Sequence, residues 1–112
     1  MRVFIASPYR GSKRRNERYA RAAMLDSLGR GEAPYVPHLL YTQVLDDSTA
    51  EERAQGIAAA LAFLPSCQVL AVYADFGVSE GMNAEMQRAR DLGVEVQVRL
   101  LAPEVFKAIR EA

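Results

Sequence analysis

A five-residue apolar run, followed by a glycine-containing loop and a helical pattern, constrains the fold of this chain more than any other feature. The run Val69–Tyr73 has no polar position on either face, which is typical of a strand buried on both sides of a parallel sheet. The loop contains Gly77, and a helical pattern then continues from Ser79 to about Leu92. Open α/β sheets bind ligands at such strand-to-helix turns, so this stretch predicts the site.

The rest of the chain alternates short strand patterns with helical patterns. Strands are expected at residues 2–6, 33–36, 68–73 and 94–98, and helices at residues 16–28, 49–64, 79–92 and 102–112. This alternation predicts a parallel sheet with right-handed crossovers, and the period-two pattern of residues 94–98 indicates an edge strand. We therefore expect an α/β fold: a single-domain, flavodoxin- or Rossmann-like three-layer sandwich over residues 1–112, with a parallel sheet of four or five strands.

Three polar residues are expected to cap the helices. For the helix over residues 49–64 the cap is Ser48 or Thr49, and Thr49 matches a capping box with Glu52 three residues later. Ser79 and Asn16 are expected to cap the helices that follow them, since both side chains can accept a hydrogen bond from a free amide of the first turn. Gly56 lies inside a helical pattern at a cost of about 1 kcal/mol relative to Ala. It therefore indicates close packing or a ligand nearby.

Composition excludes several classes of function. The 112 residues carry a formal net charge of zero, so generic nucleic-acid binding is not expected. No apolar run approaches the roughly 20 residues that span a bilayer, and Met1 leads directly into a strand pattern without a leader, so we expect no membrane partner and a cytoplasmic location. Cys67 and His38 are the only residues of their kinds, which argues against a disulfide or a metal site.

Several polar side chains follow the predicted strands at the sheet edge where ligands bind. These are Ser7, Tyr9 and Arg10 after the first strand, His38 after the second, and Asp75, Ser79, Asn83 and Glu85 after the central one, and Gly11 beside Arg10 would let the backbone approach a ligand closely. Four of the six residues from Arg10 to Arg15 are basic, which fits either a phosphate site or a solvated basic turn. His38 fits either a ligand contact or a structural loop position. Neither the dinucleotide nor the triphosphate glycine pattern occurs, and no cofactor is expected.

Glu85 is the strongest candidate for a reacting group. Gly81 precedes it by four residues, so both lie on one helix face, and the missing side chain at Gly81 leaves room for a ligand to reach the carboxylate. A carboxylate beside hydrogen-bond donors and a helix N-terminus suits cleavage of a glycosidic bond, and the helix start could hold a phosphate. The alternative is a solvated helix residue paired with Arg88 or Arg90.

Together these residues form a pattern. The spacing Ser79-x-Gly81-x-x-x-Glu85 at a strand-loop-helix junction resembles the signature of the nucleoside 2-deoxyribosyltransferase-like superfamily, which includes the deoxynucleoside 5′-monophosphate N-glycosidases. The opening stretch, residues 5–11, resembles it as well. The nearest resemblance is to small bacterial and phage proteins of that superfamily, over residues 1 to about 100. The shared positions are Ser7-Pro8-Tyr9-Arg10-Gly11, Asn16, Tyr19-Ala20, Pro37-His38-Leu39, Tyr41, Asp46-Asp47, Arg53, Gly56 and Ser79-x-Gly81-Met82-Asn83-x-Glu85.

The resemblance implies an N-glycosidase or deoxyribosyltransferase that acts on a nucleoside or nucleoside 5′-monophosphate. Glu85 would be the nucleophile, and Ser79 and Gly81 would hold the 5′ end of the substrate. The same resemblance implies that Ser7, Tyr9, Arg10 and Gly11 contact the sugar, phosphate or leaving base, with Tyr9 as a catalytic candidate. His38 and Asn83, which belong to the shared positions, are further candidate substrate contacts. Asp75 is a catalytic candidate from its place after the central strand. It also implies a homo-oligomer, usually a dimer, whose sites are completed by the neighbouring subunit.

One departure from the superfamily pattern leaves an alternative open. Characterised members carry an Asp on the helix before the central strand, where it helps to protonate the departing base, whereas residues 58–61 here are Ala-Ala-Ala-Leu. Asp75, Glu51 and Glu52 are the nearest substitutes in the sequence. The alternative functions are a catalytically inactive module that binds or senses nucleotides and, as a weaker possibility, a purely structural or interaction protein.

Overall fold

Four parallel strands form the centre of the computed structural model, which describes residues 1–112. They are β1 (Arg2–Ala6), β2 (Ala33–Tyr35), β3 (Val69–Tyr73) and β4 (Glu95–Arg99). The strand order is β2-β1-β3-β4, so the all-apolar β3 lies inside the sheet and β4 is an edge. The expected α/β class, the parallel sheet and the edge position of the last strand are confirmed.

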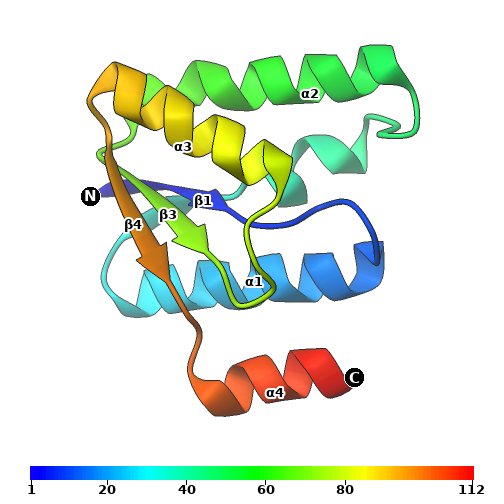
Figure 1. Ribbon diagram of the computed structural model, residues 1–112, viewed down its shortest axis with the longest axis vertical. Coiled ribbons are helices and arrows are strands. Elements are labelled where there is room, and N and C mark those ends of the chain that lie inside the picture. Colours follow the sequence, from blue (N-terminus) through cyan, green and yellow to red (C-terminus); the bar gives the residue numbers. More distant parts are fainter.

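The helices cover both faces of this sheet and complete three layers (Figure 1). α1 (Lys13–Gly29) and α4 (Pro103–Glu111) lie on one face, and α2 (Ala50–Phe63) and α3 (Glu80–Leu92) lie on the other. Three short 3₁₀ turns, η1 (Pro37–Leu39), η2 (Tyr41–Gln43) and η3 (Leu64–Ser66), complete the connections. No helix is both long enough and apolar enough to cross a membrane.

Side chains of β3 alternate between two separate apolar clusters. Val69, Ala71 and Tyr73 join the cluster beneath α1 and α4, whereas Leu70 and Val72 join the cluster beneath α2 and α3. All five residues are buried, because helices cover both faces of the strand. The continuous apolar run of the sequence is therefore a consequence of burial on two sides.

The helix starts confirm two of the three expected caps. The Ser79 hydroxyl accepts a hydrogen bond from the Met82 amide at 3.2 Å, and Thr49 accepts one from the Glu52 amide at 3.3 Å. The expectation for Asn16 is wrong. Ser12 caps α1 by accepting from the Arg15 amide at 3.3 Å, and α1 begins at Lys13.

Gly56 lies where α2 passes the η2 region. A methyl group built at this position would meet the Leu45 side chain at 3.4 Å and Tyr41 at 3.9 Å. These are ordinary van der Waals distances, so a small side chain would fit here, and Gly56 also lines the cavity described next.

Candidate functional site

A cavity of about 490 Å³ lies on the α2–α3 side of the sheet, between these two helices and the loops that follow β1 and β2. Seven of the ten residues expected at the site line it: Ser7, Tyr9, Arg10, His38, Ser79, Gly81 and Glu85. These residues come from three separate parts of the chain, and the parallel sheet brings their loops to one edge. The cavity is large enough for a small organic ligand.

Asn16 holds the loop after β1 in place through two hydrogen bonds to its backbone. The Asn16 amide group donates hydrogen bonds to the Tyr9 carbonyl at 2.9 Å and to the Arg10 carbonyl at 2.8 Å. Asn16 is buried, and its role is to fix this loop rather than to cap a helix. The neighbouring Ser7 is 1% exposed, and its hydroxyl has no hydrogen-bond partner within the chain. A buried hydroxyl without a partner beside a cavity is free to bind a ligand.

Tyr9 and His38 form an aromatic wall of the cavity. Their rings are stacked, with centroids 5.0 Å apart and an interplanar angle of 23°. Burial lowers the pKa of His38, and this effect exceeds the opposing influence of the Ser7 backbone and the Asp47 charge. The imidazole is therefore neutral near pH 7, and this wall presents flat, uncharged rings to a ligand.

Glu85 lies on α3 and carries the most perturbed carboxylate of the cavity. Burial raises its pKa to about 8. The three ion pairs of the chain join Arg30 to Asp26, Arg99 to Glu32 and Arg110 to Glu111, and none of them includes Glu85. A half-buried carboxyl group without an ion-pair partner is mostly protonated near pH 7 when its pKa is about 8. A ligand that supplies a hydrogen-bond donor or a positive charge would lower this pKa and favour the charged form.

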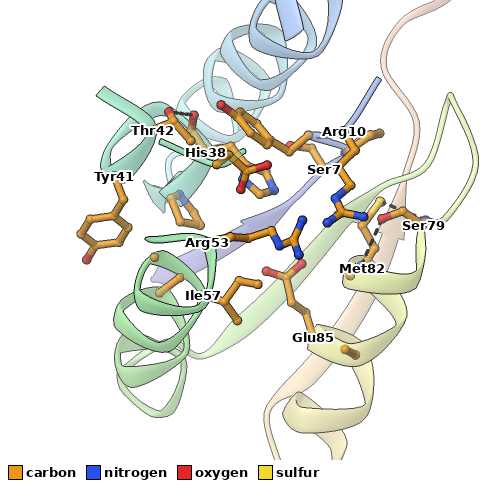
Figure 2. Close-up of a pocket in the computed structure, with 18 of the residues that line it drawn as sticks. Ser7, Arg10, His38, Tyr41, Thr42, Arg53, Ile57, Ser79, Met82 and Glu85 are labelled. Carbon is orange, nitrogen blue, oxygen red and sulfur yellow. Dashed lines mark hydrogen bonds between the residues drawn. The ribbon is translucent and has the colours of Figure 1, made fainter. Parts of the chain in front are cut away.

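Two arginines extend into the cavity from opposite walls. Arg10 extends from the β1–α1 loop toward Ser79, and Arg53 extends from α2 toward Glu85 (Figure 2). Neither guanidinium belongs to an ion pair. Arg53 was not among the site residues predicted from the sequence. Its one signal in the sequence was its place among the shared positions of the pattern, because its reach into the cavity depends on how α2 packs across from α3.

Three of the expected site residues do not line the cavity. Gly11 has a φ of 98° and serves the turn before α1, and Asn83 is exposed on α3 outside the cavity. Asp75 lies on the opposite face, where its carboxylate accepts hydrogen bonds from the Tyr19 hydroxyl at 2.5 Å and the Leu101 amide at 3.1 Å. A carboxylate engaged in this way is a structural anchor.

Residues 1–99 match the model of a family described as "Domain of unknown function (DUF7768)". The chain belongs to this family. Among solved structures, this DUF7768 chain is similar to one reported as a 2-deoxyribosyltransferase from the psychrotolerant bacterium Bacillus psychrosaccharolyticus, with a TM-score of 0.71 and 14% identity. The match covers 89% of this chain and 72% of the other, and at this identity it shows a shared fold. The comparison with curated proteins found no match.

Proposed function

We propose that the protein is an N-glycosidase or 2-deoxyribosyltransferase that acts on a nucleoside or nucleoside 5′-monophosphate, with Glu85 as the nucleophile. The observation that carries the proposal is an unpaired, half-buried carboxyl group facing a cavity at the start of a helix. The fold shared with a 2-deoxyribosyltransferase supports the same chemistry. Asp75 has no part in it, because it lies outside the cavity.

The start of α3 and Arg10 would hold the 5′ end of the substrate. The first amides of a helix have no partner within the helix, and here the Ser79 hydroxyl satisfies only the amide of Met82. Gly81 has no side chain to block the approach, since a methyl group there would meet only the Ser79 hydroxyl at 3.9 Å. A phosphate placed here would gain from the helix dipole and from the Arg10 guanidinium. The Ser7 hydroxyl would bind the sugar or its phosphate.

The reaction would proceed in two steps at the anomeric carbon. The ionised Glu85 carboxylate attacks this carbon, a carbon–oxygen bond forms, and the bond to the base nitrogen breaks with its electron pair going to the base. Water, or the nitrogen of a second base, then attacks the same carbon and releases the carboxylate. Tyr9 and His38 would form the flat wall against which the sugar or base packs.

The second candidate is a module that binds or senses a nucleotide without cleaving it. Two observations favour it. Burial favours the protonated form of Glu85 near pH 7, and the buried residue of α2 facing the cavity is Ala60, which cannot donate a proton to a leaving base. This candidate uses the same cavity and the same arginines and differs only in turnover.

A thermal-shift panel of nucleosides and nucleoside monophosphates, followed by chromatography of each hit, separates the two candidates. The enzyme predicts released base with the wild type and none with Glu85→Gln, whereas the sensor predicts stabilisation without released base. A ligand at 100 times its dissociation constant stabilises the fold by about 2.7 kcal/mol, which such a panel detects. Glu104→Gln, an exposed substitution on α4, is the matched control. Stabilisation by none of the nucleotides would contradict both candidates.

We also propose that the chain forms a homodimer. The η1–α2 region beside the cavity exposes several apolar side chains, with 49% of Leu40, 80% of Val44 and 54% of Ile57 accessible. Apolar surface of this kind beside a site is typical of an interface. Light scattering after size-exclusion chromatography tests the proposal, and Ile57→Glu is expected to shift a dimer toward the monomer. A wild type that elutes as a monomer at every concentration would contradict it.

A further inference from the structure

We propose that Arg53 assists departure of the nucleobase by stabilising its negative charge, and that it selects bases with two adjacent acceptors, the 6-oxopurines, over adenine. This inference rests on the proposed function, since it concerns the leaving group of the same reaction. It adds a residue to the chemistry and names a class of substrate.

Arg53 is placed to contact the leaving base. It projects from α2 into the cavity and points toward Glu85 (Figure 2). Its guanidinium makes no ion pair and no hydrogen bond within the chain, so its donors are free for a ligand. The carbon that Glu85 attacks must touch the Glu85 carboxylate. A base bonded to that carbon therefore lies within reach of a donor that points at the same carboxylate.

Arg10 is not placed to contact the leaving base. It extends toward Ser79 at the start of α3, which is the end of the cavity suited to a phosphate (Figure 2). A ligand with its phosphate at the start of α3 and its anomeric carbon at Glu85 engages one cation at each of these points. The cavity thus provides separate cations for the two parts of the substrate that carry negative charge in the transition state.

The other acids of the cavity are poorly placed to protonate a base. The Glu52 carboxylate is engaged by the Asp46 amide at 3.0 Å and the Thr49 hydroxyl at 3.3 Å. Glu80 is exposed in the first turn of α3. Asp47 is half-buried, lines the cavity and is the one rival, because it is close enough for its charge to act on His38. A guanidinium donates no proton at any working pH, so Arg53 would act through charge and hydrogen bonds.

The base leaves as an anion in this step. The Glu85 oxygen forms a bond to the anomeric carbon, the carbon–nitrogen bond breaks, and its electron pair remains on the base as an anion. The Arg53 guanidinium offsets this charge while it develops, and the base then takes a proton from water. Stabilisation of developing charge by a fixed donor is a common source of catalysis.

The fork of donors on Arg53 explains the choice of base. A guanidinium donates two parallel hydrogen bonds, and the N7 and O6 atoms of guanine or hypoxanthine accept both. Adenine presents N7 as an acceptor but an amino group at the neighbouring position, which opposes the second donor. One such bidentate contact discriminates between bases by about tenfold to a hundredfold.

The test uses three substrates. Two of them, the 5′-monophosphates of 2′-deoxyinosine and 2′-deoxyadenosine, differ only at position 6 of the base. The third substrate is 4-nitrophenyl 2-deoxyriboside 5-phosphate, whose leaving group needs no assistance. The variants are Arg53→Gln and Arg53→Lys, with Glu85→Gln and the exposed Arg88→Gln as controls. Thermal unfolding of each variant establishes that it is folded. Arg53→Lys keeps the charge without the fork, so it remains informative if Arg53→Gln does not fold.

We expect the wild type to prefer hypoxanthine by about tenfold to a hundredfold, and Arg53→Gln to lose this preference while it still cleaves the nitrophenyl substrate. Arg53→Lys should cleave hypoxanthine and adenine at similar rates, and Arg88→Gln should behave as the wild type does. Equal losses on all three substrates, or no preference in the wild type, overturn the inference. The same leaving-group pattern in Asp47→Asn, with Arg53→Gln unaffected, assigns the role to Asp47. Full activity of Glu85→Gln instead overturns the proposed function itself.

Discussion

The Tyr19 hydroxyl and Asp75 are joined by two hydrogen bonds. The hydroxyl donates to the Asp75 carboxylate at 2.5 Å and accepts from the Asp75 amide at 2.9 Å. Phe76, the next residue, packs edge-on against Tyr19 and Phe106, and the Arg15 guanidinium lies 4.2 Å from its ring centre. These contacts attach the loop before α3 to α1 and α4. The start of α3, and with it Glu85, is therefore positioned from the opposite face of the sheet.

Tyr19→Phe is expected to lower the free energy of unfolding by about 1–3 kcal/mol, because it leaves the Asp75 amide unpaired and removes one partner of its carboxylate. Urea unfolding measures this difference. Tyr9→Phe is the matched control, since Tyr9 contributes its ring to a stack and its backbone carbonyl to a hydrogen bond. A loss as large in the control would show that the effect is not specific to the Tyr19–Asp75 contact.

Ser7→Ala should weaken ligand binding without lowering the stability of the fold. The Ser7 hydroxyl is buried without a partner, so its removal should leave the free energy of unfolding unchanged or slightly increased. The same substitution should weaken nucleotide binding by about fivefold to tenfold, which corresponds to the loss of one hydrogen bond. Urea unfolding and calorimetric titration measure the two effects. Unchanged affinity would show that Ser7 does not contact the ligand.

Glu85→Gln should stabilise the protein, and the gain should increase with pH. The carboxyl group ionises near its ordinary pKa of 4.5 in the unfolded chain and near 8 in the folded chain. Between these values the folded state keeps a proton that the unfolded state has released, so the free energy of unfolding falls as pH rises, and it levels off above pH 8. Glutamine has no such dependence. Melting temperatures at pH 5 and pH 9 measure it, with Glu104→Gln as the control; equal differences at both values would contradict the prediction.

The rate of base release should rise with pH. Glu85, the proposed nucleophile, must be ionised to react, and its pKa in the free protein is about 8. In the proposed reaction kcat/KM should therefore increase about tenfold per pH unit below pH 8 and then become constant. A nucleoside substrate avoids the second ionisation of a phosphate, which occurs near pH 6. His38 titrates below its ordinary range, because burial lowers its pKa, and is therefore distinguishable. A rate that falls as pH rises would instead identify Glu85 as a protonated acid.

Features determined by local chemistry could be predicted from the sequence. The burial of Val69–Tyr73, the caps Ser79 and Thr49, and the cavity-facing position of Glu85 all depend on neighbours within a few residues. The sheet topology follows from the alternation of strands and helices. The gathering of Ser7, Tyr9, Arg10 and His38 at one edge follows from that topology.

Features that depend on distant contacts were missed. Asn16 resembles a cap in the sequence, but its partners are carbonyls in the loop before the helix. Asp75 is two residues beyond Tyr73 and faces the same side as that residue, toward α1 rather than the cavity. This period-two signal was present in the sequence. The role of Arg53 was harder to detect, because it depends on how α2 packs across from α3, which no local pattern specifies.

The contact between Phe76 and Phe106 has a consequence for how related chains diverge. Phe106 lies in α4, beyond residues 1–99, which match the family model. Relatives that keep every cavity residue but differ at this contact would hold the start of α3 at a different height above the sheet. Two chains with identical reacting groups could then differ in rate or in substrate size. The cavity side chains alone would therefore not determine the geometry of the site, because α4 takes part in setting where those side chains meet.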